Sequence, residues 1–195
     1  NKIRVKASQT NSHNDVKIAS HSEQGMRTSQ EDRCVVVPNV AKLPIFNNKG
    51  QRTVVIENDA KEYLHQFSIV CVFDGHSGHH VSQYLYDNFV NNLVENYSRF
   101  IGKGIQSLMI DCCENIDNDI CKALRADEDS AGSTGVMAVY DGRKHVLTVA
   151  NVGDSSCILC TKDGKATRVL KMHRCADEGE RARIVKCNAK VMNNR

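Results

Sequence analysis

The segment FSIVCVFDGHSG, residues 67–78, joins an apolar run to a turn of polar residues. Its first part, Phe67 to Phe73, predicts a short strand that is apolar enough to be buried on both faces of a sheet. Asp74 ends this strand, and Gly75 lets the main chain turn sharply and expose its carbonyl. A carboxylate and a carbonyl at a rigid strand end are oxygen ligands of the kind that Mg²⁺ or Mn²⁺ takes. The segment therefore predicts a buried strand with chemistry at its end.

The flanking sequence predicts further strands and two long helices. On the N-terminal side we expect strands from residue 16 toward residue 25, at 33–37 and at 53–56, with an irregular loop over 38–52. On the C-terminal side we expect helices over 81–94 and 101–124 (closed by the acidic residues 127–129), antiparallel strands at 135–140, 145–152, 156–160 and 166–170, tight turns at 141–142 and 162–164, and a short helix over 177–186. Consecutive helices between runs of strands indicate an α+β fold with antiparallel sheets.

Composition is that of a globular domain. The 195 residues are 41% hydrophobic and 25% charged, with two prolines and twelve glycines, which excludes collagen-like and low-complexity chains. We expect a polar, disordered lead over residues 1–15 and one domain, or part of a larger one, over 16–195, with no secretory signal and no membrane span. Residues 161–195 carry a net charge of +6. They hold no aromatic for stacking on bases, so a solvated face is favoured over nucleic-acid binding.

Nine cysteines indicate a reducing compartment rather than a disulfide scaffold. The number is odd, and Cys71, Cys112 and Cys121 fall within apolar or helical patterns, where reduced cysteine acts as a small hydrophobe. We expect a soluble protein of the cytoplasm or nucleus. Cys157 and Cys160 form a CxxC pair, but on an extended strand their thiols point to opposite faces, which favours strand packing over metal or redox chemistry.

Acidic residues recur at the ends of predicted strands. Glu31 and Asp32 precede one strand, Asp74 follows another, and Asp154 follows a third. Taken singly, an Asp-Gly pair is usually a turn and an acidic pair at a strand start is usually exposed to solvent. Their combination and order point to a site for hard cations.

Six short segments in order resemble the motifs of the metal-dependent protein phosphatase 2C family. They are GMRTSQED (25–32), VFDGHSG (72–78), GST (132–134), ANVGDS (150–155), and the looser fifth motif LKMH (170–173) followed by ERARI (180–184). The resemblance runs from about residue 16 to residue 184. It implies a β-sandwich flanked by helix pairs, and hydrolysis of phosphoserine and phosphothreonine in phosphoprotein substrates.

The same resemblance implies a centre with two Mn²⁺ or Mg²⁺ ions and a bridging water that attacks phosphorus directly, without a covalent phosphoenzyme. Asp74 would bridge both metals, Glu31 would bind one, and the Gly75 carbonyl would bind the other. Asp32 would orient metal-bound water more than ligate directly. Asp154 matches the position of a third, weaker metal in the family.

Two further roles follow from the resemblance. Arg27 would hold the substrate phosphate through its planar fork, and His76 would protonate the leaving oxygen as general acid. Without these neighbours Arg27 would be taken for a surface arginine. A zinc site of His76 with His79 and His80 is the weaker interpretation, since no His-Glu-x-x-His pattern is present. The small residues of Gly132-Ser133-Thr134 need no catalytic role, because they allow close packing behind the metals.

The chain departs from the family pattern at three places. Ser156 stands where arginine is usual, and Met172-His173-Arg174-Cys175 replaces the usual Asp-His-Lys-Pro, which we expect to reshape a nearby loop. The two C-terminal metal aspartates of the family have no counterpart, because residues 184–195 contain no acid. We therefore expect a C-terminally incomplete phosphatase, with a monomer as the expected state. The alternative is a truncated, catalytically inactive module that binds phosphoproteins.

Overall fold

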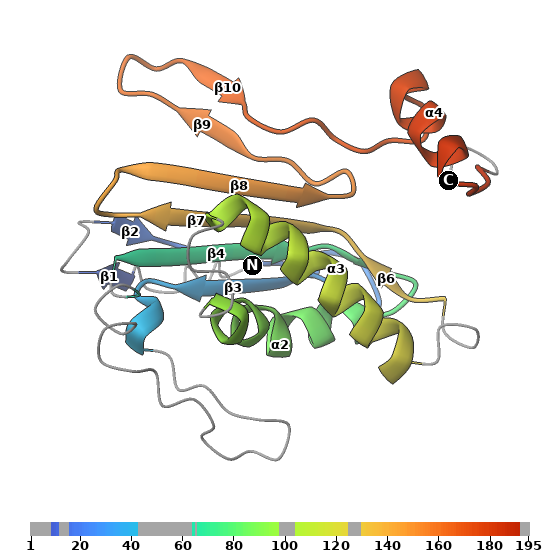
Figure 1. The fold of residues 1–195 in the computed structure, drawn as a ribbon, viewed down its shortest axis with the longest axis horizontal. Helices are drawn as coiled ribbons and strands as arrows, with labels where there is room; N and C mark the ends of the chain where they lie inside the picture. Colours follow the sequence, from blue (N-terminus) through green and yellow to red (C-terminus); the bar gives the residue numbers. More distant parts are fainter. Residues whose placement is uncertain are drawn as a thin grey trace.

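An antiparallel sheet of four strands forms the centre of the protein, in the order β3-β4-β7-β8 (Figure 1). The computed structural model describes residues 9–11, 16–42, 64, 66–97, 104–124 and 130–191. The strands are β3 (Arg33–Val37), β4 (Phe67–Phe73), β7 (Gly135–Asp141) and β8 (Val146–Val152). All four lie where the apolar patterns predict them.

The turn between β7 and β8 is longer than the sequence suggests. Residues 142–145 form it, so the expected two-residue turn at Asp141-Gly142 is wrong. Asp141 closes the turn, because its Oδ1 accepts hydrogen bonds from the backbone N–H groups of Arg143 and Lys144 at 3.0 and 3.1 Å. His145 completes it with a φ of 54°.

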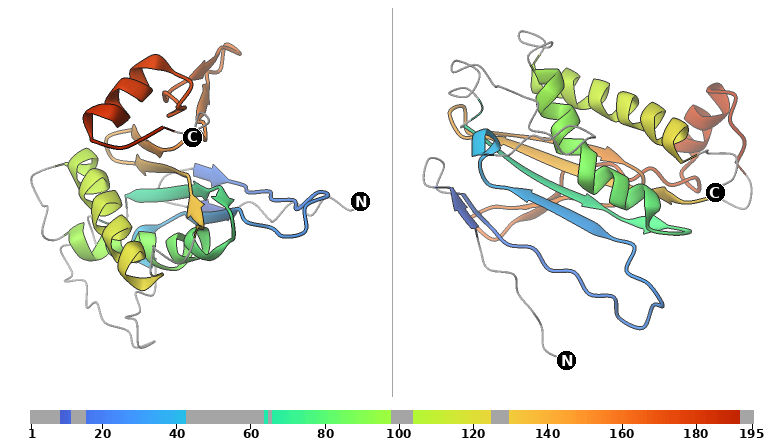
Figure 2. Two further views of the ribbon diagram at one scale, coloured as in Figure 1. Left: turned by 90° about the vertical axis from the view of Figure 1, so that its right-hand side faces the viewer. Right: turned by 90° about the horizontal axis from the view of Figure 1, so that it is seen from below.

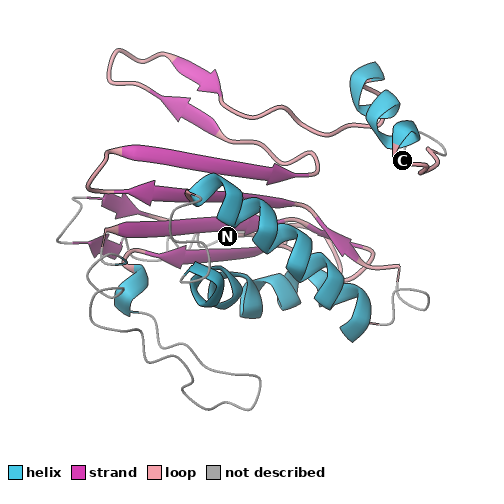
Figure 3. Cartoon of the chain, viewed as in Figure 1, coloured by secondary structure: helices cyan, strands magenta, loops and turns pink. Residues whose placement is uncertain are grey.

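Two helices cover one face of the sheet (Figures 2 and 3). They are α2 (His80–Tyr97) and α3 (Ile105–Ala123), and their apolar stripes pack on alternate residues of β4. Phe73 and Phe89 meet edge to face with ring centroids 5.8 Å apart. Helix α3 begins at Ile105, later than predicted, because Gly104 has a φ of 84°. The hydrophobic core therefore lies between this helix pair and the sheet.

The opposite face of the sheet is more open. Val72 of β4 is 42% exposed and Val70 is half-buried, so the prediction that β4 is buried on both faces is wrong. The helix pair covers only the face that carries Ile69, Cys71 and Phe73. The small ladder of β1 (Gln9–Asn11) and β2 (Val16–Ile18) lies on the other side (Figure 2).

Shorter elements complete the described part of the chain. A turn of 3-10 helix, η1 (Val40–Lys42), follows β3, and two small antiparallel ladders join β5 (Gly75–His76) to β6 (Gly132–Ser133) and β9 (Ile158–Cys160) to β10 (Ala166–Arg168). The last helix is α4 (Glu178–Lys186), with Asp177 as its N-cap. The predicted strand at 53–56 and the acidic helix end at 127–129 lie outside the described residues. The α+β class with antiparallel sheets and paired helices is confirmed.

All nine cysteines are free thiols. Cys71 and Cys112 are buried as expected, and burial raises the pKa of both thiols well above the ordinary range. Burial also raises the pKa of Cys113 to about 11. Cys121 is exposed on α3. Within the described ranges, no helix combines the length and apolar character that a membrane crossing requires.

Candidate active site

The register of the sheet places four of the motifs at one end. Arg33 pairs with Phe73 where β3 begins and β4 ends, so Asp32 and Asp74 are the next residues beyond the ladder on each side. At the same end, β7 starts at Gly135, which pairs with Val152 at the end of β8. Residue 134 and the Gly153-Asp154 turn therefore lie beside the acidic pair.

Three carboxyl groups converge there. The pKa of Asp74 is raised, first by partial burial, then by the charge of Asp32 and a hydrogen bond with its carboxyl group, and then by the charge of Asp154. His76 acts in the opposite direction. Like charges held this close repel one another unless a cation or a proton lies between them. The arrangement therefore attracts positive charge.

Glu31 makes contacts through both its backbone oxygen and its carboxylate. Its backbone oxygen accepts a hydrogen bond from the buried hydroxyl of Ser82 in the first turn of α2. Its carboxylate accepts a hydrogen bond from Ser29 at 3.1 Å and is not among the groups that shift the pKa of Asp74. Glu31 is therefore adjacent to Asp32 in the sequence, but the hydrogen bond of its carboxylate is with Ser29 and not with Asp74.

Gly75 fits a very tight space. A Cβ atom at this position would lie 2.5 Å from the backbone oxygen of Glu31 and 2.7 Å from the hydroxyl of Ser82. The sequence suggests glycine here for a sharp turn. The structure shows that close approach of the two main chains also requires it.

Thr134 ties the motifs together. Its N–H donates to the Asp74 carbonyl at 2.9 Å, its hydroxyl oxygen accepts from the Asp74 N–H at 3.3 Å, and that hydroxyl lies 2.6 Å from the hydroxyl of Ser155. Beside it, the imidazole of His76 lies so close to Gly132 that a Cβ there would overlap the ring. The predicted close packing by the small residues 132–134 is thus present, and one of its contacts is with His76.

Asp154 has a basic partner. Arg174 Nε lies 3.5 Å from Asp154 Oδ2. The segment that carries Arg174 is held against the turn before Asp154, because the N–H of His173 donates to the Gly153 carbonyl at 2.9 Å and the Gly153 N–H donates to His173 Nδ1 at 3.3 Å. The looser fifth motif therefore contacts the fourth directly.

Arg27 lies in an exposed segment that precedes β3. It is exposed in the segment between β2 and β3, next to the fully exposed Met26, and this segment extends beyond the sheet in both views of Figure 2. Its backbone N–H donates to Gln24 O at 3.3 Å. The charged groups that act on Asp74 are thus Asp32, Asp154 and His76, and Arg27 is not among them.

The acidic residues and the histidines near β5 are the candidate metal ligands of this site. Among the described residues, no group of three or more His, Cys, Asp or Glu side chains has the spacing to hold a metal ion, and this includes His76, His79 and His80. His79 and His80 instead place their rings 4.8 Å apart. The pair Asp32 and Asp74, with the nearby backbone oxygens, still has the chemistry that a hard divalent cation prefers.

The sequence analysis did not predict two contacts of this site: Ser82 with the Glu31 carbonyl, and Arg174 with Asp154. In the sequence, Ser82 stands out as a serine within the apolar stripe of α2, and Arg174 directly follows His173. Neither pattern indicates which residue will be the partner. Both contacts depend on how distant segments meet, which the sequence alone does not supply.

The fold and site together define an α+β domain with an acidic centre at one end of an antiparallel sheet. The family model described as "Protein phosphatase 2C" matches residues 16–195. The chain therefore belongs to the protein phosphatase 2C family, which confirms the resemblance of the sequence motifs.

Curated relatives agree. The chain is 30% identical over 179 residues to "Protein phosphatase 1L" of Bos taurus, covering 89% of this chain and 42% of that protein. It is 29% identical over 161 residues to "Protein phosphatase 2C homolog 1" of Schizosaccharomyces pombe, covering 77% and 46%. The chain spans less than half the length of these relatives.

Solved structures show the same fold. A structure described as "a C.elegans sex determining protein" matches with a TM-score of 0.67 at 21% identity, over 98% of this chain and 40% of that one. A phosphatase from a pathogenic strain of Toxoplasma gondii matches with a TM-score of 0.54 at 20% identity, over 87% of this chain and 56% of that one.

Proposed function

We propose that this chain supplies the acidic centre of a metal-dependent protein serine/threonine phosphatase. The observation that carries the proposal is the meeting of Asp32, Asp74 and Asp154 at the end of the sheet, in a member of the protein phosphatase 2C family. Phosphoserine and phosphothreonine proteins would be the substrates. The free, protonated buried thiols favour a reducing compartment, the cytoplasm or nucleus, as its location.

Asp74 and Asp32 would hold Mn²⁺ or Mg²⁺, with the Gly75 carbonyl as a further ligand and Asp154 for an additional, weaker ion. Such cations supply charge neutralisation and activation of water for attack on phosphorus. His76 would donate the proton that the leaving serine or threonine oxygen needs, from a ring that lies close against Gly132. Glu31 and Arg27 would join the site as metal ligand and phosphate anchor.

The test combines stability and activity. Without metal, we expect Asp74→Asn to be at least as stable as the wild type, because it removes a like-charge contact. Mn²⁺ should raise the Tm of the wild type and of the control Asp87→Asn on the exposed face of α2, but not that of Asp74→Asn.

Release of phosphate from a phosphothreonine peptide should follow the same pattern and stop with EDTA. A Tm shift and peptide binding without phosphate release would instead indicate an inactive phosphoprotein-binding module. No response of the Tm to Mn²⁺ in any variant would contradict the metal site itself.

A further inference from the structure

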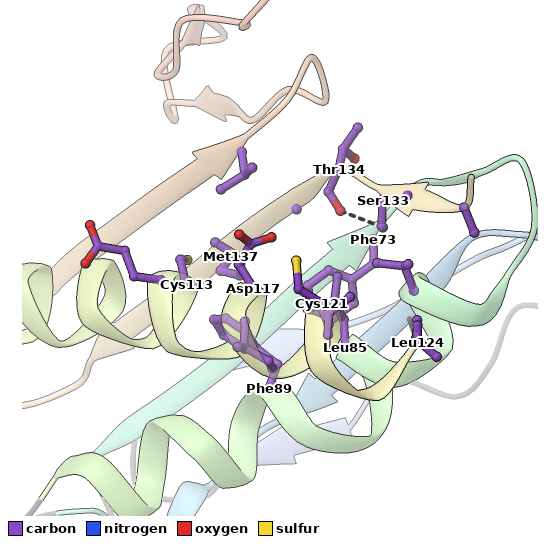
Figure 4. A pocket seen from close by; sticks show the side chains of 18 of the residues that line it. Phe73, Leu85, Phe89, Cys113, Asp117, Cys121, Leu124, Ser133, Thr134 and Met137 are labelled. Atoms are coloured by element: carbon purple, nitrogen blue, oxygen red, sulfur yellow. Dashed lines mark hydrogen bonds between the residues drawn. The ribbon is translucent and has the colours of Figure 1, made fainter. Parts of the chain in front are cut away.

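A deep cleft lies between the helix pair and the sheet (Figure 4). Its volume is about 730 Å³, within the usual range of 300–1,000 Å³ for pockets that bind organic ligands. Phe73, Phe89 and Met137 line it, and all three side chains are almost fully buried. The cleft is thus an apolar cavity that reaches the hydrophobic core.

One end of the cleft belongs to the candidate active site. His76, Ser133 and Thr134 also line the cavity. Thr134 makes two hydrogen bonds with the backbone of Asp74, so the cleft begins where the acidic centre ends. A chain whose phosphoresidue lies at Asp74 can therefore place a nearby side chain in the cleft.

The wall formed by α3 is acidic. Glu114 and Asp117 line the cleft, and both are exposed. Arg183 of α4 lines it too, but its guanidinium is held by Glu180, with Nε to Oε2 at 2.9 Å and Nη2 to Oε1 at 2.5 Å. Because Arg183 is paired with Glu180, the carboxylates of Glu114 and Asp117 give this part of the cleft a negative charge.

We propose that this cleft recognises a segment of the phosphoprotein substrate in which an apolar side chain stands next to a lysine or arginine. The apolar side chain would enter between α3 and the sheet, and the basic one would meet Glu114 and Asp117. The inference rests on the proposed function, since it assigns the substrate class of the same site.

The experiment uses the 195-residue chain and two probes. The first is a set of phosphothreonine peptides with a Leu-Arg pair at successive positions on either side of the phosphoresidue, compared with an Ala-Ala series. The second is p-nitrophenyl phosphate, which has no peptide segment beside its phosphate to occupy the cleft. Binding of the unphosphorylated, fluorescently labelled peptides by anisotropy gives a readout that does not depend on catalysis.

Three variants separate the contributions. Cys121→Phe fills the cleft from an exposed position on α3 and should weaken the Leu-Arg peptide roughly tenfold, as expected for loss of one buried apolar side chain. Asp117→Lys should weaken it several-fold. The matched control Asp119→Lys, which lies on the polar groove of α3 beside Lys122, should leave it unchanged.

The outcomes for the two proposals are distinct. Preference for Leu-Arg peptides that is lost in Cys121→Phe and Asp117→Lys, with p-nitrophenyl phosphate turnover unchanged, supports the inference. The same loss in anisotropy without any phosphate release supports the cleft and contradicts the proposed function. Equal affinity for the Leu-Arg and Ala-Ala series overturns the inference. A small apolar molecule or a second copy of this chain would then be the occupant to test.

Discussion

The protein has two regions that are stabilised in different ways. Residues 33–152 contain the sheet and the helix pair, and in the described part of the chain they hold the whole hydrophobic core. Over residues 153–191, by contrast, Glu180 is the one buried residue. The β9–β10 hairpin and α4 expose apolar side chains such as Ile158 and Val185 to solvent, at 57% and 58%. The first region is therefore stabilised by apolar burial and the second by polar contacts.

The candidate active site lies where these regions meet. Asp74 and His76 come from the first region, Asp32 directly precedes it, and Asp154 comes from the start of the second. The link between the regions consists of hydrogen bonds, including the Thr134–Ser155 pair and Asn151 Nδ2 to the Lys171 carbonyl at 3.1 Å. Part of the site thus belongs to the region that holds the hydrophobic core, and part depends on these hydrogen bonds, which form a polar seam between the two regions.

The largest expected effect comes from opening the core. Phe89→Ala should lower the free energy of unfolding by about 3–5 kcal/mol, because it removes a ring that is 1% exposed and contacts Phe73. Val185→Ala on α4 should change it by less than about 0.5 kcal/mol. Urea denaturation followed by circular dichroism measures both. Similar losses for the two variants would show that the second region also shares the core.

The next largest effect concerns the seam. Thr134→Val keeps the shape of the side chain but removes the hydroxyl that contacts Ser155 and the Asp74 N–H, and should cost about 1–2 kcal/mol. A double-mutant cycle with Ser155→Ala should give a coupling energy of at least about 0.5 kcal/mol. Additive losses would mean that the two hydroxyls do not act together.

A smaller effect is expected from the exposed ion pair. Arg174→Ala should change global stability by less than about 1 kcal/mol, since both side chains are at least half exposed. It should nevertheless increase the affinity of the Asp154 region for Mn²⁺, because the competing cation is removed. Isothermal titration calorimetry gives that affinity, with Arg168→Ala on β10 as control. An unchanged or weaker affinity would argue against competition.

The smallest expected change in global stability comes from the pH response of α4. The N–H of Glu180 donates to Asp177 and lowers the pKa of this N-cap carboxyl, and Lys171 adds to the shift. The charged form is favoured in the folded helix, so the stabilisation is present above the usual Asp pKa and is lost as pH falls through the lowered value. Glu180, whose pKa is lowered by Arg183, acts in the same direction.

We therefore expect α4 to fray on acidification while the sheet stays folded. Amide hydrogen exchange and NMR chemical shifts of residues 180–186 measure this. Asp177→Asn, which keeps an N-cap acceptor without a charge, should reduce the pH dependence but retain the helix. Asp177→Ala should fray at all pH values. Simultaneous loss of α4 and the sheet with pH would contradict independent behaviour.

The core elements were predictable from local pattern. The bounds of β3 and β4 follow directly from apolar runs, and α2 follows from residues at helical spacing. The exposed face of β4 was not predictable, since Val70 and Val72 have the same residue type whether a second layer covers them or not. The start of α3 was missed because Ile101 fits its apolar spacing, although the helix begins only after Gly104, its N-cap.

The site was predictable in part. Strand-end carboxylates could be identified one by one, but only the pairing of Arg33 with Phe73 shows that Asp32 meets Asp74. The Arg174–Asp154 ion pair depends on the path of the chain after β10.

The tight contacts of Gly75 and Gly132 have a genetic consequence. Each glycine lies where an added carbon atom would collide with a neighbour, the Glu31 carbonyl in one case and the His76 ring in the other. A random-mutagenesis screen for loss of function should therefore recover substitutions at these two codons as often as at Asp74 or His76. Substitutions at this site are therefore limited as much by the two positions that cannot carry a side chain as by the positions that carry reactive groups.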